Sequence, residues 1–166
     1  MTPARMSKMP DSYRVADLLF AGEYPFAPDP TKGRSKLAGV LDAGITSFVD
    51  LTTPADRLLP YAALLTELAD AGRVAVRHFA HGIPDNDVPD TPALMRRILD
   101  TIDAEIRDGR RIYVHCWGGV GRTGLVVGCY FVRKGMTGGT ALKKVRSLFE
   151  TMSPERVERH APGAAA

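Results

Sequence analysis

The residues with the clearest chemical potential lie close together, in the segment RIYVHCWGGVGRTG at residues 111–124. In its first five residues, Ile112 and Val114 alternate with Tyr113 and His115, which predicts a short strand that ends just before Cys116. A loop with three glycines follows, and the pair Arg122–Thr123 then opens a mostly apolar stretch with helical spacing. The segment therefore predicts a loop, residues 116–121, that joins the carboxyl end of a strand to the amino end of a helix. We call it the Cys116 loop.

The composition of the Cys116 loop suits an anion site that holds a nucleophile. Glycines at 118, 119 and 121 permit tight turns, which let successive backbone N–H groups converge on one point. The positive end of the helix dipole and the planar guanidinium of Arg122 add to the attraction for a phosphoryl group. The same field favours the thiolate form of Cys116. A nucleophile and an oxyanion cradle in one loop are what displacement at phosphorus requires.

The sequence HCWGGVGRTG resembles the HC-x5-R-[ST] signature of the cysteine-dependent protein tyrosine phosphatase superfamily, especially its compact dual-specificity branch. This resemblance implies hydrolysis of phosphomonoesters through a phosphocysteine formed on Cys116, with no metal and no other cofactor. The expected phosphate-binding positions are Trp117, Gly118, Gly119, Val120, Gly121 and Arg122. Thr123 resembles the hydroxyl that stabilises the departing thiolate in this family. His115 is expected to brace the loop from behind, because adjacent strand residues point to opposite faces.

An aspartate upstream of the cysteine, in a mobile loop, is the general acid of this family. The segment HFAHGIPDNDVPDTP resembles the general-acid loop of kinase-associated and related phosphatases, with Pro89 shortly after the acid, and it places Asp85 31 residues before Cys116. Asp87 is the rival candidate. Asp90 is disfavoured, because with the Thr and Pro that follow it is typical of a helix cap and first turn. The alternative interpretation of Asp85 is a plain turn residue.

Three further residues have a structural and a functional interpretation. Trp117 either lines the mouth of the pocket or packs beneath the loop. Arg57, in the turn TTPADR, is expected to be a solvated charge rather than a substrate contact. Cys129 would lie about 12 Å along the helix at a rise of about 1.5 Å per residue, too far to bond with Cys116, so we expect it in the core.

Hydrophobic periodicity predicts the elements that must position these residues. Strands are expected at 17–24, 45–51, 74–79 and 111–115, and helices over segments that include 37–41, 64–68, 94–106, 125–131 and 141–149. Strands that alternate with helices predict an α/β fold with a central, mostly parallel sheet and helices on both sides, similar to dual-specificity phosphatases. A site beyond the carboxyl end of a strand, at a helix start, fits the general rule for such sheets.

The chain of 166 residues, 45% hydrophobic and 25% charged, is consistent with one phosphatase domain over residues 1–160 and a flexible tail at 161–166. The net charge of +3 suits anionic substrates, but the basic residues are scattered, so nucleic-acid binding is not indicated. No apolar run approaches eighteen residues, and the amino terminus lacks a hydrophobic signal core. We therefore expect a cytoplasmic monomer with no membrane contact. The Ala and Arg bias suggests a bacterial source.

The choice of substrate remains open at this stage. The loop contains no lysine, unlike phosphatases that grip several phosphates of an inositol lipid, and Trp117 and Val120 stand at those positions. A phosphoprotein, with phosphotyrosine before phosphoserine or phosphothreonine, is the favoured substrate, and an inositol phosphate or another small phosphoester is the alternative. Two hypotheses concern other classes of protein. The first is a distorted nucleotide-binding P-loop, with Cys116 in place of the first glycine and Arg122 in place of the lysine. The second is a catalytically silent module that binds phosphorylated partners.

Overall fold

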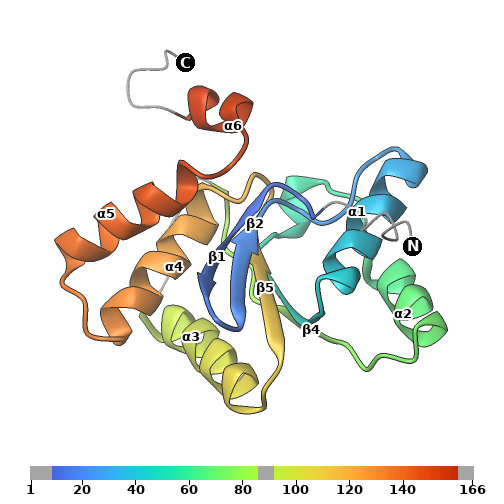
Figure 1. The fold of residues 1–166 in the computed structure, drawn as a ribbon, viewed down its shortest axis with the longest axis horizontal. Coiled ribbons are helices and arrows are strands. Elements are labelled where there is room, and N and C mark those ends of the chain that lie inside the picture. The colour runs from blue at the N-terminus through green and yellow to red at the C-terminus, as the bar shows by residue number, and fades with distance from the viewer. Residues whose placement is uncertain (1–8, 86–91, 161–166) are drawn as a thin grey trace, which may run out of the picture.

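A five-stranded sheet lies between two layers of helices in the computed structural model, which describes residues 9–85 and 92–160 (Figure 1). In spatial order the strands are β1 (Ser12–Ala16), β2 (Leu19–Gly22), β5 (Arg111–His115), β3 (Ile45–Asp50) and β4 (Arg77–Ala80). The last four run parallel to one another, and β1 pairs antiparallel with β2 at one edge. The predicted α/β fold with a mostly parallel central sheet is confirmed.

Helices cover both faces of the sheet (Figure 1). On one face pack α1 (Pro30–Asp42) and α2 (Ala62–Ala71); on the other pack α3 (Pro92–Arg107), α4 (Gly121–Arg133) and α5 (Gly138–Phe149). The 3-10 turn η1 (Pro54–Asp56) follows β3, and a short helix, α6 (Pro154–Arg159), follows α5. Each face of the sheet has its own buried apolar cluster, which the amphipathic faces of these helices complete.

The central strand β5 shows how the sequence pattern becomes two layers. Ile112 and Val114 belong to the cluster beneath α3 and α4, whereas Tyr113 belongs to the cluster beneath α1 and α2. His115 lies on the side of Tyr113, and the two rings stack with their centroids 5.7 Å apart. Cys116 packs in the other cluster. Alternation along the strand thus delivers the thiol to the face of α4 and the imidazole to the opposite face.

The first part of the sheet differs from the prediction. The pattern predicts one strand over 17–24, whereas the chain forms a hairpin of two strands, β1 and β2, with Ala16 paired to Leu19. β1 is an edge strand whose Arg14 side chain is exposed, so its apolar alternation is weak. The hairpin matters for the site because β2 lies directly beside β5, and its last residue, Gly22, pairs with His115.

Two smaller differences concern β4 and α6. β4 begins at Arg77 rather than at residue 74, because Arg73 has a left-handed backbone (φ 55°) and Val74 is exposed. α6 is absent from the sequence-based prediction, since a helix of six residues is too short to show a period.

In the described ranges, 9–85 and 92–160, no helix is long and apolar enough to span a membrane. The predicted tail, residues 161–166, lies outside the described residues.

Candidate active site

The Cys116 loop connects the carboxyl end of β5 to the start of α4 and surrounds a nearly buried thiol. Cys116 is 3% exposed, and its Sγ accepts a hydrogen bond from the backbone N–H of Gly119 at 3.3 Å. The carbonyl groups of the loop point the other way: the carbonyl of Trp117 accepts from the N–H of Tyr24 at 2.9 Å, and that of Cys116 accepts from His115 Nδ1 at 3.1 Å. In a trans peptide the C=O and N–H groups point in opposite directions. Because these two carbonyl groups point away from the thiol, the N–H groups of the same peptides face the centre of the loop.

Of the three glycines in the loop, Gly119 is the one whose backbone conformation and surroundings leave no room for a side chain. It has a φ of 75°, and a Cβ placed there would lie 2.3 Å from the backbone carbon of Gly22 in β2. Gly118 and Gly121 do not have positive φ, and a Cβ at Gly121 would meet nothing within 4 Å. Of these three residues, Gly119 combines left-handed backbone with close contact.

Arg122, in the first turn of α4, is held from behind by a carboxylate. Its Nη1 and Nη2 donate to the two Oδ atoms of Asp56 at 2.9 and 3.0 Å, and Nη1 also donates to the carbonyl of Ile83 at 2.9 Å. Burial alone would lower the pKa of Arg122, but the hydrogen bonds to Asp56 and the nearby negative charges raise it. Nε of Arg122 is buried and, within the described part of the chain, has no partner. A phosphoryl oxygen in the loop would supply that partner.

Asp56 is the functional candidate that the sequence analysis missed. It ends η1, where its carboxylate also accepts from the backbone N–H of Thr53 at 2.7 Å in a capping box. Although burial would raise its pKa, the hydrogen bonds from Arg122 and Thr53 lower it, so Asp56 is a carboxylate. The spacing T-x-x-D in TTPADR could have revealed the cap. Arg57, the residue of this turn that the sequence analysis singled out, is exposed and is not among the residues that line the pocket.

His115 is fully buried behind the loop and forms two hydrogen bonds. Because Nδ1 donates to the carbonyl of Cys116, Nε2 is the acceptor for the hydroxyl of Tyr61 at 2.7 Å. Burial lowers the pKa of His115 to about 4, against the weaker opposing effect of Asp50, so the ring is neutral near pH 7. The imidazole is thus placed to orient the backbone of Cys116 and not to exchange protons with substrate.

Thr123 does not make the expected contact. The side chain is fully buried, and its Oγ1 has no hydrogen-bond partner within residues 9–85 and 92–160. The structure therefore shows no bond between this hydroxyl and Cys116 Sγ; its role toward a departing thiolate stays a prediction.

The candidate acid Asp85 lies on the same pocket as the thiol. Its side chain is 57% exposed, and Oδ1 is 3.5 Å from Nη2 of Arg122. The rival Asp87, together with Pro89 and Asp90, lies outside the described residues.

The pocket over the Cys116 loop has a volume of about 700 Å³. Trp117 lines it with a side chain that is 59% exposed, which favours a place at the pocket mouth over one beneath the loop. Three basic residues that the sequence analysis did not single out also line it: Arg156, Arg159 and His160.

Cys129 is partly buried against the core and is a free thiol, as expected. Across the described ranges, no three His, Cys, Asp or Glu side chains group in a way that could hold a metal ion.

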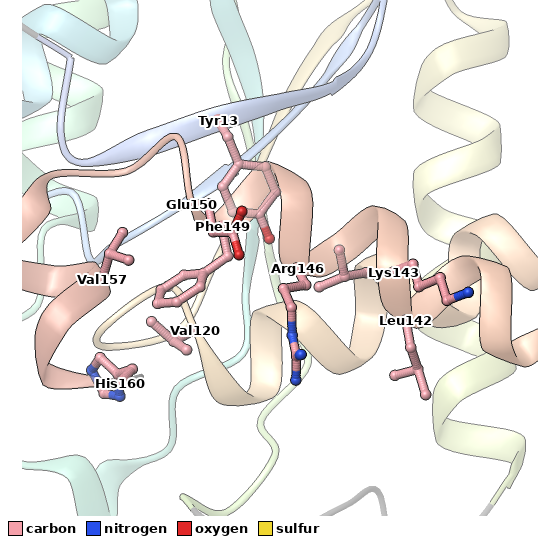
Figure 2. A pocket seen from close by; sticks show the side chains of 11 residues that line it. Tyr13, Val120, Leu142, Lys143, Arg146, Phe149, Glu150, Val157 and His160 are labelled. Atoms are coloured by element: carbon pink, nitrogen blue, oxygen red, sulfur yellow. The ribbon is translucent and has the colours of Figure 1, made fainter. Parts of the chain in front are cut away.

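A second, more apolar pocket of about 580 Å³ lies on the other side of α6. Figure 2 shows Val157 of α6, and His160 just after that helix, gathered with Phe149 of α5 and Val120 of the Cys116 loop. The rings of Phe149 and His160 meet edge to face with centroids 6.3 Å apart. Val157 also packs against the apolar cluster that contains Cys116.

Comparisons with known proteins agree with this geometry. The family described as "Polymorphic toxin system, DSP-PTPase phosphatase" matches residues 28–136, more than half of the chain. Phosphatidylglycerophosphate phosphatase PTPMT1 of Arabidopsis thaliana is 27% identical over 136 residues, which are 81% of this chain and only 36% of that protein. The crystal structure of Tk-PTP in the active form is 26% identical, with a TM-score of 0.67 over 90% of this chain and 92% of that one. A kinase-associated phosphatase with its catalytic-site cysteine changed to serine has a similar fold, at 18% identity and a TM-score of 0.64 over 83% and 82% of the two chains.

Proposed function

This chain belongs to the polymorphic-toxin family of DSP-PTPase phosphatases, and we propose that Cys116 is the nucleophile with which it hydrolyses phosphomonoesters. The enzyme is a cysteine-dependent phosphatase of the dual-specificity type. The observation that carries the proposal is the hydrogen bond from the Gly119 N–H to the buried Cys116 Sγ, beside an Arg122 guanidinium that Asp56 fixes in place. A cysteine beside a backbone donor and a guanidinium suits displacement at phosphorus, because the donors can bind the phosphoryl oxygens while the sulfur attacks.

The reaction would run in two displacements. The Cys116 thiolate attacks phosphorus, the bond from phosphorus to the alcohol or phenol oxygen breaks, and Asp85 donates a proton to that departing oxygen. Water then attacks the phosphocysteine, Asp85 accepts a proton from this water, and Cys116 leaves as a thiolate with inorganic phosphate as the product. Thr123 is proposed to stabilise the thiolate at that moment through its buried hydroxyl, which has to turn toward Sγ.

Arg122 and the backbone N–H groups of the loop would stabilise the transition state. In the trigonal-bipyramidal state the charge is spread over three equatorial oxygens, and donors that are already oriented toward these oxygens lose little entropy when they bind them. We assign to them the unpartnered Nε of Arg122 and the backbone N–H groups from Trp117 to Arg122.

We favour phosphotyrosine in proteins as the substrate. The exposed indole of Trp117 at the pocket offers an aromatic face beside the leaving group, which suits a phenolic ester. A small phosphoester, such as an inositol phosphate or the head group of a lipid, is the second candidate. One observation favours it: the curated relative from Arabidopsis thaliana is named as a phosphatidylglycerophosphate phosphatase.

The first experiment is hydrolysis of p-nitrophenyl phosphate in the presence of EDTA. We expect full activity in the wild type and in Cys116→Ser a loss of at least ~1,000-fold, because the hydroxyl is a far weaker nucleophile than the thiolate. Cys129→Ser is the matched control, since Cys129 lies in the core away from the pocket, and it should retain activity. Activity in Cys116→Ser, or loss of activity in EDTA, would contradict the proposed chemistry.

The general acid is identified by changing the leaving group. Asp85→Asn should lower kcat for phenyl phosphate by about 100-fold or more but have a much smaller effect with 2,4-dinitrophenyl phosphate, whose phenolate leaves without a proton. Asp87→Asn should show neither effect. The reverse pattern would assign the acid to Asp87.

The substrate class is tested with a panel at equal phosphate concentration: a phosphotyrosine peptide, a phosphoserine peptide, soluble inositol phosphates, and vesicles that contain phosphatidylglycerophosphate. We expect the highest kcat/KM for the phosphotyrosine peptide. A higher value for the vesicles or the inositol phosphates would favour the second candidate.

A further inference from the structure

Arg156 on α6 connects the Cys116 loop to two other segments of the chain. Its Nε donates to Asp11 Oδ2 at 2.8 Å, its Nη2 donates to Glu23 Oε2, and its Nη1 donates to the carbonyl of Gly118 at 2.6 Å. The three acceptors come from the strand β1 region, the end of β2 and the loop itself. The guanidinium therefore uses all of its nitrogen atoms in contacts within the protein.

The acceptor in the loop is the carbonyl of the peptide that joins Gly118 to Gly119. In a trans peptide the C=O and N–H groups point in opposite directions across one rigid plane. The N–H of this same peptide is the donor to Cys116 Sγ at 3.3 Å. A donor that pulls the carbonyl outward thus turns the N–H inward, toward the thiol and toward the phosphoryl group that would occupy the loop.

The neighbouring peptides of the loop are fixed in other ways. The carbonyl of Trp117 is bound by the backbone of Tyr24, and the carbonyl of Cys116 by the ring of His115. Glycine on both sides leaves the 118–119 peptide the least restricted by side chains, so its orientation depends most on what its carbonyl binds. Among residues 9–85 and 92–160, the donor shown for this carbonyl is Arg156.

The charge around Arg156 favours a positioning role over direct binding of phosphate. The guanidinium lies between the carboxylates of Asp11 and Glu23, which offset its positive charge. Asp11 also accepts from the backbone N–H and the hydroxyl of Ser153 at 2.9 and 2.6 Å, at the start of α6. Burial alone would raise the pKa of Asp11, but these hydrogen bonds and Arg156 lower it. The cluster thus anchors both α6 and the arginine.

We propose that Arg156 is a positioning residue that holds the 118–119 peptide with its N–H toward Cys116 and the transferred phosphoryl group. This inference rests on the proposed function of Cys116. Without Arg156 the peptide gains freedom to rotate, and one donor is lost both from the thiolate and from the phosphoryl oxygens.

The test compares Arg156→Ala with two control variants on the same short helix. Glu158→Ala removes an exposed side chain and leaves the network intact. Val157→Ala weakens the packing of α6 against the core cluster, where Figure 2 shows Val157 near Phe149, without touching Gly118. For each variant we would measure kcat and KM for p-nitrophenyl phosphate, the pH profile of kcat/KM, inhibition by inorganic phosphate, and thermal unfolding.

Arg156→Ala should lower kcat by about 10- to 100-fold, in the range expected for weakening one oriented backbone donor. The pH profile of kcat/KM should change, because a donor beside the reacting sulfur is lost, and inorganic phosphate should inhibit more weakly. Added guanidinium at millimolar concentration should restore part of kcat to Arg156→Ala but not to Val157→Ala. Neither control should move the pH profile.

Two results would overturn the inference. One is an Arg156→Ala variant with wild-type kcat and pH profile. The other is a Val157→Ala variant with the same losses as Arg156→Ala and no response of either to guanidinium, which would assign Arg156 to the packing of α6 alone. Both differ from failure of the proposed function, in which Cys116→Ser would keep its activity.

Discussion

At the scale of single residues, the close approach of Gly119 to β2 is the tightest constraint on the Cys116 loop. The backbone of Gly119 lies so near Gly22 that a Cβ would overlap it, and its φ of 75° disfavours any side chain. The same residue donates its N–H to Cys116 Sγ. The contact with β2 therefore limits where Gly119 can lie, whereas Arg156 acts on the direction of its N–H.

Gly119→Ala should lower kcat for p-nitrophenyl phosphate by ~100-fold or more, because the loop has to move away from β2 to make room. It should also lower the free energy of unfolding by ~2–4 kcal/mol, from overlap and backbone strain. Urea unfolding and kinetics on the same preparation measure both. Gly139→Ala, in the first turn of α5, meets open space and serves as the control. A fully active Gly119→Ala enzyme would contradict the constraint.

Asp56→Asn should lower kcat/KM by about 10-fold or more, because the amide no longer holds both nitrogens of Arg122 as a carboxylate does. The matched control is Asp108→Asn, which removes a carboxylate from an exposed pair with Arg77 and should leave kcat/KM unchanged. Equal kinetics for the two variants would remove Asp56 from the account of the site.

The sequence predicts those site residues that lie in one continuous motif. Cys116 and Arg122 come from the segment around the loop, where type and spacing are read directly. Asp56, Tyr61 and Arg156 come from distant segments, and nothing local distinguishes them from an ordinary turn or surface residue. Only the fold brings them to the loop.

At the scale of elements, the junction between β5 and the start of α2 supports the thiol from behind. The hydroxyl of Tyr61, which precedes α2, and the carbonyl of Cys116 bind the two ring nitrogens of His115. The ring is fully buried and neutral, so protonation would place an unpaired charge in the core.

The free energy of unfolding should therefore decrease as the pH falls from about 6.5 to about 4, the window between the ordinary pKa of histidine and that of buried His115. In this window the unfolded chain binds a proton that the folded chain does not, and the loss reaches at most ~3 kcal/mol. Urea titrations at pH 7, 6 and 5 measure it. Because the pKa of His81 is also lowered, chiefly by burial, His81→Gln is the control that isolates the share of His115. A pH-independent free energy in His81→Gln would contradict a neutral buried ring.

Elements with strong amphipathic patterns are predicted well, and weak ones are not. α3 carries its apolar residues at helical spacing, and β5 alternates between two clusters, so both are evident from sequence. The β1–β2 hairpin and α6 are short and lie at an edge, where their position depends on tertiary contacts such as the Asp11–Ser153 hydrogen bonds.

At the scale of the whole molecule, the proposed reactive site and a second buried polar network lie at opposite ends of the sheet. The Cys116 loop follows the carboxyl end of β5. At the amino ends of the strands, the buried Glu105 of α3 accepts from Ser47 Oγ at 2.5 Å and pairs with Arg77 and Arg110 at 3.0 and 3.3 Å. This second network ties α3 to β3 and β4 far from the thiol.

Glu105→Ala should lower the free energy of unfolding by ~3 kcal/mol, because it removes the buried carboxylate that accepts from the Ser47 hydroxyl and offsets the charge of Arg110. The kcat of the folded enzyme should stay within about twofold of wild type, since no reacting group is touched. Chemical denaturation and kinetics at low temperature separate the two effects. A large loss of kcat in a folded Glu105→Ala enzyme would contradict the separation.

The fold is confirmed because it depends on a pattern that spans the chain, and the family is confirmed because its motif lies in one continuous segment. Alternating strands and helices predict the sheet, and the Cys116 loop identifies the phosphatase superfamily. Membership in a phosphatase family also removes the nucleotide-binding loop, whereas the silent binding module is tested by the hydrolysis of p-nitrophenyl phosphate. The extent of the domain, residues 1–160, stays a prediction, which a single cooperative transition in calorimetry would support.

Catalysis by Cys116 requires that the phosphoryl group is bound covalently to its sulfur before phosphate is released. The most direct measurement is to mix the enzyme with a ³²P-labelled aryl phosphate, denature it within milliseconds, and map the label by peptide analysis. We predict label on the peptide that contains Cys116, none in Cys116→Ser, and decay of the label at the rate of phosphate release. Turnover with no label on that peptide, or label on another residue, would contradict the account.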